Sequence, residues 1–219
     1  MFKNRKIAAM ELAMELLKFK NENPLILAIP RGGVELGYYI ANELECEWSV
    51  IISRKLGYPK QPEAAFGALG EDKSLYFNPN IESRLSKELI ENVINKEEIE
   101  IQRRIKLYRD GASLPDIQGR TVIIVDDGIA TGATIFVTVE MCKKAHAKKI
   151  IIATPVADSE VSKHLLEITD ELVVLETPFN FFAVSQVYQD FKNLSDTEVL
   201  KFLNTRKPSL KLSNVLMKV

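Results

Sequence analysis

The stretch that decides the fold is Val122-Ile-Ile-Val-Asp-Asp-Gly-Ile-Ala-Thr-Gly-Ala-Thr134. Its four apolar residues do not alternate with polar ones, which predicts a strand covered on both faces, as in a parallel sheet flanked by helices. The strand runs directly into two acids, Asp126 and Asp127. Ligands of open parallel sheets bind at the carboxyl ends of the strands, so we expect both carboxylates to face a ligand crevice.

A turn follows the acids and leads into a helix start, Ala130-Thr131-Gly132-Ala133-Thr134. The glycine allows a close approach of the backbone to a ligand, and the free N–H groups of a helix start favour a phosphate. The two threonine hydroxyls add donors. Two carboxylates for sugar hydroxyls or a metal, about one helical turn from a phosphate cradle, suit a ribose 5-phosphate. The alternative is an ordinary strand, turn and helix with a polar cap.

Apolar runs and helical spacing alternate along most of the chain. This alternation predicts a doubly wound, mostly parallel five-stranded sheet flanked by helices. The expected strands are 25–29, 48–53, 121–125, 149–153 and 171–175, and the expected helices are 5–20, 33–43, 81–109, 132–146 and 159–167. A hairpin is expected between 64–69 and 75–77.

Composition limits the class of protein. The 219-residue chain is 46% hydrophobic, which is sufficient for a full core. Its net charge of −1 provides no field that would attract nucleic acid or a membrane surface. No apolar run approaches the roughly 20 residues that span a bilayer. We therefore expect a cytoplasmic protein without nucleic-acid or membrane partners.

Cationic residues follow the first two expected strands. Arg31-Gly32-Gly33 combines a charge-assisted donor with two glycines that allow close approach to an anion. Arg54 and Lys55 place two adjacent cations at the end of the second strand, on the side of the same crevice. The alternatives are a tight turn with a surface arginine and a solvated basic turn. Arg103, Arg104 and Arg109 are better explained as a solvated helix end.

The apolar run, double acid, turn and Thr-Gly-x-Thr segment together resemble the phosphoribosyl-pyrophosphate signature of the type I phosphoribosyltransferases. The resemblance implies the type I fold, with Asp126 and Asp127 on the ribose hydroxyls and residues 130–134 on the 5-phosphate. It implies that the loop 31–33 grips the pyrophosphate. It also implies that Arg54 and Lys55 join the two acids as catalytic residues.

The similarity extends to about Leu203 and is to a branch of stand-alone or hydrolase-fused members of unassigned substrate. It implies a mobile lid over 59–69 and one domain over residues 1–204. That domain would have a core of about 22–176 and a small hood made by the terminal segments, followed by a basic tail at 205–219. Aromatic residues after the last strand would either stack on a base or pack the hood. We also expect a homo-oligomer, a dimer.

The reaction implied is transfer of ribose 5-phosphate from phosphoribosyl pyrophosphate to a nucleobase-like acceptor, with release of pyrophosphate. Mg²⁺ would be held mainly through the substrate phosphates, with Asp126 and Asp127 as the candidate protein ligands and no firm protein site. One residue departs from the hypoxanthine and guanine branches, which carry an Asp where this chain has Ala130. That departure puts a 6-oxopurine acceptor in doubt.

A non-catalytic sensor of phosphoribosyl pyrophosphate is the alternative function. Regulators of that kind carry a DNA-binding module, and the sequence contains no basic recognition helix. A sensor also has no need of a lid or of cations placed on a leaving group. A dinucleotide oxidoreductase would need a GxGxxG fingerprint, which Gly32 and Gly33 do not provide.

Overall fold

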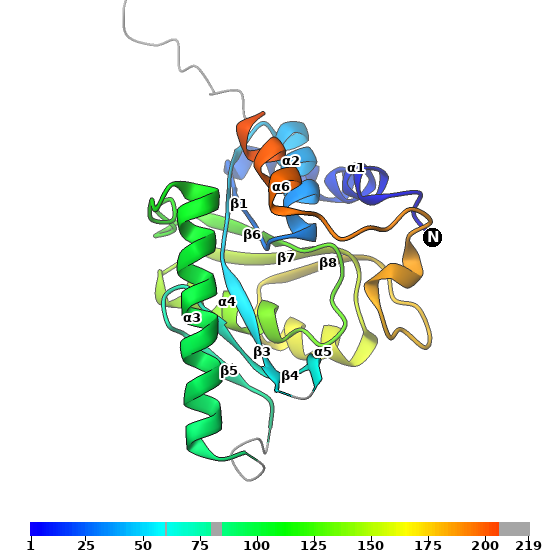
Figure 1. The fold of residues 1–219 in the computed structure, drawn as a ribbon. Coiled ribbons are helices and arrows are strands. Elements are labelled where there is room, and N and C mark those ends of the chain that lie inside the picture. Colours follow the sequence, from blue (N-terminus) through cyan, green and yellow to red (C-terminus); the bar gives the residue numbers. More distant parts are fainter. Residues whose placement is uncertain (60, 80–84, 206–219) are drawn as a thin grey trace, which may run out of the picture.

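The computed structural model describes residues 1–59, 61–79 and 85–205. Its centre is a parallel sheet in the order β2-β1-β6-β7-β8 (Figure 1). The strands are β1 (Leu25–Ala28), β2 (Glu47–Val50), β6 (Thr121–Val125), β7 (Lys149–Val156) and β8 (Glu171–Glu176). All five residues of β6 are buried, because strands flank it on both edges and helices cover both faces. The predicted five-stranded sheet is confirmed.

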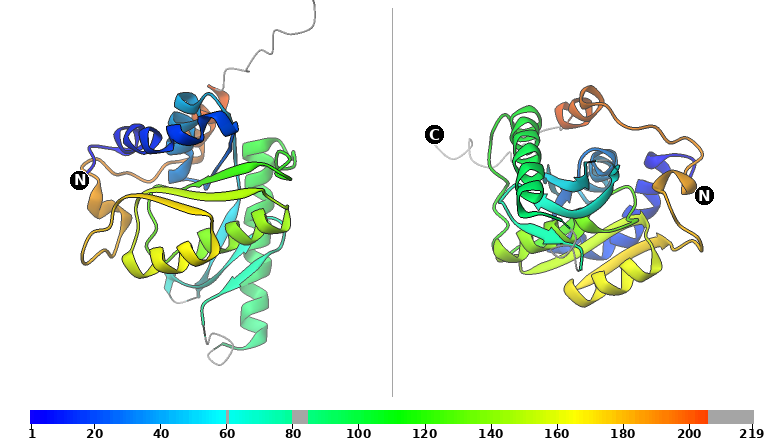
Figure 2. Two further views of the ribbon diagram at one scale, coloured as in Figure 1. Left: turned by 180° about the vertical axis from the view of Figure 1, so that it is seen from behind. Right: turned by 60° about the horizontal axis from the view of Figure 1, so that its bottom comes forward.

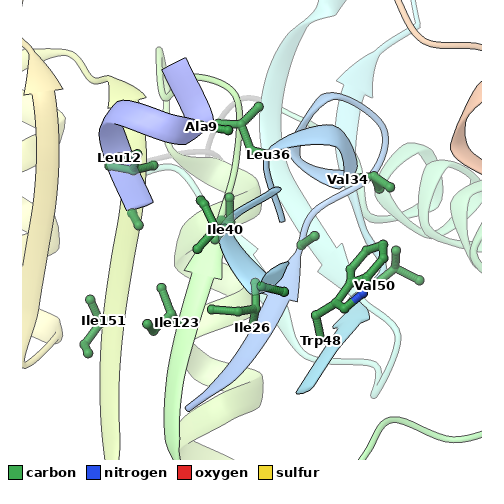
Figure 3. Packing of buried hydrophobic residues seen from close by; sticks show 14 of the residues in the cluster. Ala9, Leu12, Ile26, Val34, Leu36, Ile40, Trp48, Val50, Ile123 and Ile151 are labelled. Atoms are coloured by element: carbon green, nitrogen blue, oxygen red, sulfur yellow. The ribbon is translucent and has the colours of Figure 1, made fainter. Parts of the chain in front are cut away.

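Helices cover the sheet on both faces, and side-chain alternation decides which residues meet them. On one face, Ile26, Ile123 and Ile151 pack beneath α1 (Arg5–Leu16) and α2 (Gly32–Leu44) (Figure 3). On the other face, Leu27, Val122 and Ile124 pack against residues of α4 (Ala133–Lys144) and α5 (Ser159–Ile168). Successive residues of a strand point to opposite faces, so each strand contributes to both cores.

A second, three-stranded antiparallel sheet is made by β3 (Ser53–Tyr58), β4 (Gln61–Gly70) and β5 (Leu75–Phe77). The expected strand 48–53 was therefore wrong, because it is divided between two sheets. The Ile51 N–H still bonds to Ala28 of the main sheet, whereas Ile52 accepts from Glu71 beyond β4. The chain changes sheets between these two residues. The hairpin between β4 and β5 is confirmed.

The helix α3 (Lys87–Arg109) stands beside this second sheet along one side of the molecule (Figure 1). It begins after Ser86, whose hydroxyl accepts from the Leu89 N–H. The expected start at residue 81 falls in 80–84, outside the described residues. The segment 59–69, expected to be a lid, lies mostly in β4, and Phe66 and Ala68 are fully buried. Residues 66–69 therefore belong to a packed strand rather than to a loop.

The N-terminal segment and the chain after β8 form the hood, defined here as residues 1–5 and 177–205, and the N-terminus lies beside the segment that follows β8 (Figure 2). It contains two short elements, η2 (Val184–Val187) and α6 (Asp196–Asn204). Main-chain hydrogen bonds join Phe2 to Val187 and Lys3 to Asp190. Residues 206–219, most of the expected basic tail, lie outside the described residues. Among the described helices, none combines the length and apolar character needed to cross a membrane.

The remaining segments agree with the predicted periodicity except at their ends. The first helix is shorter than expected, because the α-helix stops at Leu16 and continues as the 3₁₀ helix η1 (Leu17–Glu22). Asn23 then adopts a left-handed conformation with φ of 48° before the chain enters β1. Asparagine tolerates this conformation better than most residues.

Candidate active site

A cleft of about 1100 Å³ opens at the carboxyl ends of β1 and β6 and extends toward α3 and the hood. It brings together nearly all the residues that the sequence singled out: Arg31, Gly32, Arg54, Lys55, Asp126, Asp127, Ala130, Thr131, Gly132 and Thr134 line it. Gly33 and Ala133 lie behind this lining and are buried. The cleft volume lies slightly above the usual range of small-molecule sites, about 300–1,000 Å³.

The two acids at the end of β6 differ in their surroundings. Asp126 accepts a hydrogen bond from the Asp127 N–H at 2.9 Å. Burial, and after it the neighbouring charge of Asp127, raises the pKa of Asp126 well above its usual value. Asp127 instead forms an ion pair with Arg5, with 2.7 Å between Nε and Oδ2. One of the two acids thus already has a cationic partner, and the other favours its proton.

Arg5 is the site residue that the sequence did not reveal. It lies at the start of α1, its side chain is only 4% exposed, and it lines the cleft. Its Nη1 donates to the Lys192 carbonyl oxygen at 2.8 Å, and its guanidinium lies over the Phe191 ring at 4.2 Å. The signal available was an arginine on the first turn of an otherwise apolar helix face, which points to a buried partner but cannot name it.

The glycines after β1 allow the start of α2 to lie directly against the end of β6. A Cβ on Gly32 would lie 1.8 Å from Oδ2 of Asp127, and one on Gly33 would lie 2.6 Å from the Val125 carbonyl oxygen. Only glycine fits at either position. Both glycines thus have a packing role toward the acid pair in addition to leaving the backbone open to a ligand. The peptide bond between Pro30 and Arg31 is cis.

The helix start at residues 131–134 offers unpaired donors. Gly132 precedes α4 with φ of +72°, a conformation that favours glycine. Within the part of the chain that the structure describes, the main-chain N–H groups of Thr131 to Thr134 donate to no carbonyl or side chain. Free N–H groups at the positive end of a helix are an anion site.

The cations Arg54 and Lys55 reach the cleft from β3 rather than from the main sheet, which corrects their expected position. Arg54 is held by α3, since its Nε lies 2.7 Å from Oε2 of the buried Glu97. Lys55 is exposed, and its charge opposes the rise in the pKa of Asp126. Among the described residues Lys55 forms no ion pair, so its charge is available to a ligand.

Of the three arginines at the end of α3, Arg103 is exposed, as expected of a solvated helix end, whereas Arg104 and Arg109 are not. Arg104 lines the cleft and pairs with Glu100 at 2.7 Å. Arg109 is buried and donates to both carboxylate oxygens of Glu71. Burial raises the pKa of Glu71, and the hydrogen bond from Arg109 opposes that rise. Arg104 belongs to the cleft, whereas Arg109 joins α3 to the second sheet.

The aromatic residues after β8 divide into two groups. Phe181 and Tyr188 are buried in the hood, where they pack with Phe2. Phe179 and Phe182 are 95% and 79% exposed. Phe191, which the sequence did not single out, lines the cleft. Packing in the hood therefore explains part of the aromatic cluster.

Asp126 and Asp127 are the carboxylates of the cleft lining that lie next in the chain to the loop 131–134. The described residues contain no group of three or more His, Cys, Asp or Glu side chains that could hold a metal ion by themselves. Two adjacent carboxylates fit the usual binding of Mg²⁺, in which one or two carboxylates hold the ion while water molecules and substrate phosphates complete its coordination.

Comparison with known proteins agrees with this geometry. A family model described as "Phosphoribosyl transferase domain" matches residues 2–190. Two Mycobacterium tuberculosis proteins, from strains CDC 1551 / Oshkosh and H37Rv, are each named "Putative phosphoribosyl transferase". They are 37% identical over 206 residues, which cover 93% of this chain and 46% of theirs. The chain thus spans about half the length of these curated relatives.

A solved structure is also similar over nearly its whole length. The crystal structure of TT1426 from Thermus thermophilus superposes with a TM-score of 0.77 at 32% identity. The match covers 92% of this chain and 97% of that chain.

Proposed function

The chain belongs to the phosphoribosyl transferase domain family, and on that premise we propose that it transfers ribose 5-phosphate from phosphoribosyl pyrophosphate to a nitrogenous base. The observation that carries this proposal is a single cleft that combines the loop 131–134, whose N–H groups have no partner among the described residues, with the acids Asp126 and Asp127 and the cations Arg31 and Lys55. A sugar with a phosphate at one end and a pyrophosphate at the other matches that order of groups.

In the proposed donor complex the 5-phosphate binds to Ala130–Thr134, where helix N–H groups and threonine hydroxyls supply donors. The ribose hydroxyls bind to Asp126 and Asp127. The pyrophosphate lies toward the loop 31–33. Arg54 and Lys55 approach it from the second sheet, which places positive charge near the leaving group.

The reaction breaks the bond between C1 of the ribose and a pyrophosphate oxygen and forms a bond from C1 to a base nitrogen, which loses its proton. Positive charge develops on the sugar, and the acid pair would stabilise it through the Asp127 carboxylate and the carbonyl oxygen of the Asp126 carboxyl group. Most of the rate enhancement would come from holding donor and acceptor aligned, which can contribute roughly 7–11 kcal/mol. The cleft between hood, acid pair and α3 supports that positioning role.

We propose that Mg²⁺ accompanies the donor, with Asp126 and Asp127 as its protein contacts. When bound, the ion would neutralise charge on the departing pyrophosphate as a Lewis acid. The residues of the chain then need only orient the donor.

The acceptor is proposed to be a base other than a 6-oxopurine. Ala130 lines the cleft, and its methyl group cannot accept a hydrogen bond from a purine nitrogen. A weak response to hypoxanthine and guanine is therefore expected. Ala130→Asp would alter the preference among bases without changing the affinity for phosphoribosyl pyrophosphate.

We further propose one functional domain over residues 1–204, acting in the cytoplasm as a homodimer. Cys46 and Cys142 are free thiols, as is usual in reducing compartments. An apolar stripe on the outer face of α1 supports self-association, since Ile7, Met10, Met14 and Leu17 are each at least 37% exposed. Light scattering of the purified protein would test the dimer.

The experiment that tests the transfer reaction is mass spectrometry of the nucleotide formed from Mg²⁺–phosphoribosyl pyrophosphate and each member of a panel of bases. The proposal predicts a nucleoside 5′-monophosphate that appears only with an added base. Binding of phosphoribosyl pyrophosphate without product from any base would favour the non-catalytic sensor instead.

A further inference from the structure

The guanidinium of Arg5 is fixed at the boundary between the acid pair and the hood. The Phe2 N–H donates to the Val187 carbonyl oxygen and the Asp190 N–H donates to the Lys3 carbonyl oxygen, and these two bonds hold the N-terminal segment against the chain after β8. Arg5 follows directly and is held beside Phe191. Its place in the cleft therefore depends on tertiary structure at both ends of the described chain.

The hydrogen-bonding capacity of this guanidinium exceeds the number of acceptors that its neighbours provide. Nε donates to Asp127 and Nη1 donates to the Lys192 carbonyl oxygen. Among the described residues, Nη2 has no hydrogen-bond acceptor. The side chain is 4% exposed and lines the cleft. Unpaired donors on a nearly buried guanidinium are thus presented to whatever the cleft binds.

The surroundings of Nη2 fit a planar ring. The Phe191 ring lies 4.2 Å from the guanidinium carbon, and the lining of the same cleft also includes Val184 and Leu194. An apolar and aromatic wall next to a few fixed donors is the usual composition of a site for a heterocycle.

The charge of Arg5 is already balanced. Asp127 lies 2.7 Å from Nε in a pair that is largely screened from water, so little net positive charge remains to attract an anionic acceptor. A guanidinium donor whose charge is balanced in this way suits a carbonyl oxygen, which accepts two hydrogen bonds, and opposes an amino group, which would place donor against donor.

Resting on the proposed function, we infer that Arg5 determines acceptor specificity by donating from Nη2 to a ring carbonyl oxygen, and that the acceptor is a monocyclic oxo base. The monocyclic part combines this carbonyl oxygen with the proposed exclusion of 6-oxopurines at Ala130. Arg5 thus donates to two groups, since its Nε bonds to Asp127 and its Nη2 would bond to the carbonyl oxygen of the base.

The test is calorimetric and requires no turnover. Ribose 5-phosphate, UMP and AMP are titrated into the wild-type protein and into Arg5→Lys, which keeps the charge beside Asp127 but loses the fork of donors. Lys6→Gln, a change on the exposed side of the next residue, is the matched control. Wild-type protein should bind UMP at least about tenfold more tightly than ribose 5-phosphate and AMP, as expected for a hydrogen bond from a charged group.

In Arg5→Lys, UMP should no longer bind more tightly than ribose 5-phosphate, while the affinity for ribose 5-phosphate should change little. If UMP and ribose 5-phosphate lose affinity equally, Arg5 only positions Asp127 and the inference is wrong. Equal binding of UMP and AMP by the wild-type protein would also overturn it, even if the variant failed to fold. If the wild-type protein bound ribose 5-phosphate but gained nothing from either base, the acceptor assignment alone would fail. Absence of all binding would remove the proposed function as well.

Discussion

The Nε of Arg5 and the Oδ2 of Asp127 lie 2.7 Å apart, although 122 residues separate them in the chain. The side chains are 4% and 14% exposed. This ion pair ties the hood to the end of the central strand, so the N-terminal segment is part of the acid pair's environment. The adjacent residue, Asp126, forms no ion pair with any of the described residues.

This asymmetry predicts different stabilities for two neighbouring variants. Asp127→Asn leaves the buried charge of Arg5 without its counter-ion and should lower the free energy of unfolding by about 3 kcal/mol. Asp126→Asn should cost less than about 1 kcal/mol, because Asp126 favours its neutral form and Asn keeps an acceptor for the Asp127 N–H. Urea unfolding of both variants measures the difference. Equal losses would contradict the described asymmetry.

Asp126 also predicts how stability depends on pH. Burial and the charge of Asp127 raise its folded-state pKa above the unfolded value, so the folded state holds a proton that the unfolded state releases. Stability from this group is present below the ordinary Asp pKa and is lost as pH rises toward the raised value. Urea midpoints measured from acidic to neutral pH should show this fall in wild-type protein more steeply than in Asp126→Asn. If the urea midpoint changed with pH equally in both proteins, the raised pKa assigned to Asp126 would be wrong.

Gly32→Ala should disrupt the acid pair from the other side. The added Cβ would lie 1.8 Å from Oδ2 of Asp127, so the carboxylate must move and the pairing with Arg5 weakens. We expect a loss of about 1–3 kcal/mol in stability, together with weaker binding of Mg²⁺–phosphoribosyl pyrophosphate. Gly119→Ala is the control, since Gly119 has φ of +69° but nothing lies within 4 Å of its Cβ. It should lose stability and keep binding.

The unpaired N–H groups at 131–134 predict an anion in crystals. Crystals grown with sulfate should hold the ion against the N–H groups of Thr131 to Thr134 and the threonine hydroxyls. Soaking with ribose 5-phosphate should displace the sulfate and place the sugar phosphate there. A sulfate bound elsewhere in the cleft, with this loop left bare, would contradict the 5-phosphate assignment.

The sequence predicted the central sheet and most of the site because both rest on local signals. Apolar runs mark the buried parallel strands, and the acids and glycines follow them directly in the chain. Contacts between distant segments carry no such signal. The pairing of Arg5 with Asp127, the presence of Phe191 in the cleft and the hold of Glu97 on Arg54 all depend on how the termini and α3 pack.

The boundary between β2 and β3, near residue 51, is a second feature that local sequence signals could not predict. The run from Trp48 to Ile52 reads as one strand, yet its residues up to Ile51 bond to the main sheet, whereas Ile52 bonds to Glu71, directly after β4 of the second sheet. Only the tertiary partners decide where it divides. Arg54 and Lys55 consequently belong to the second sheet and approach the cleft from its side.

Calorimetry of Mg²⁺–phosphoribosyl pyrophosphate binding to wild-type protein and to the double variant Asp126→Asn with Asp127→Asn tests the central claim most directly. Circular dichroism at a temperature below the unfolding transition of both proteins confirms that each is folded. The account predicts binding by the wild-type protein and none by the folded double variant, because the ribose hydroxyls and the ion lose both carboxylates. Unchanged affinity in the double variant would contradict the assignment of the cleft as the donor site.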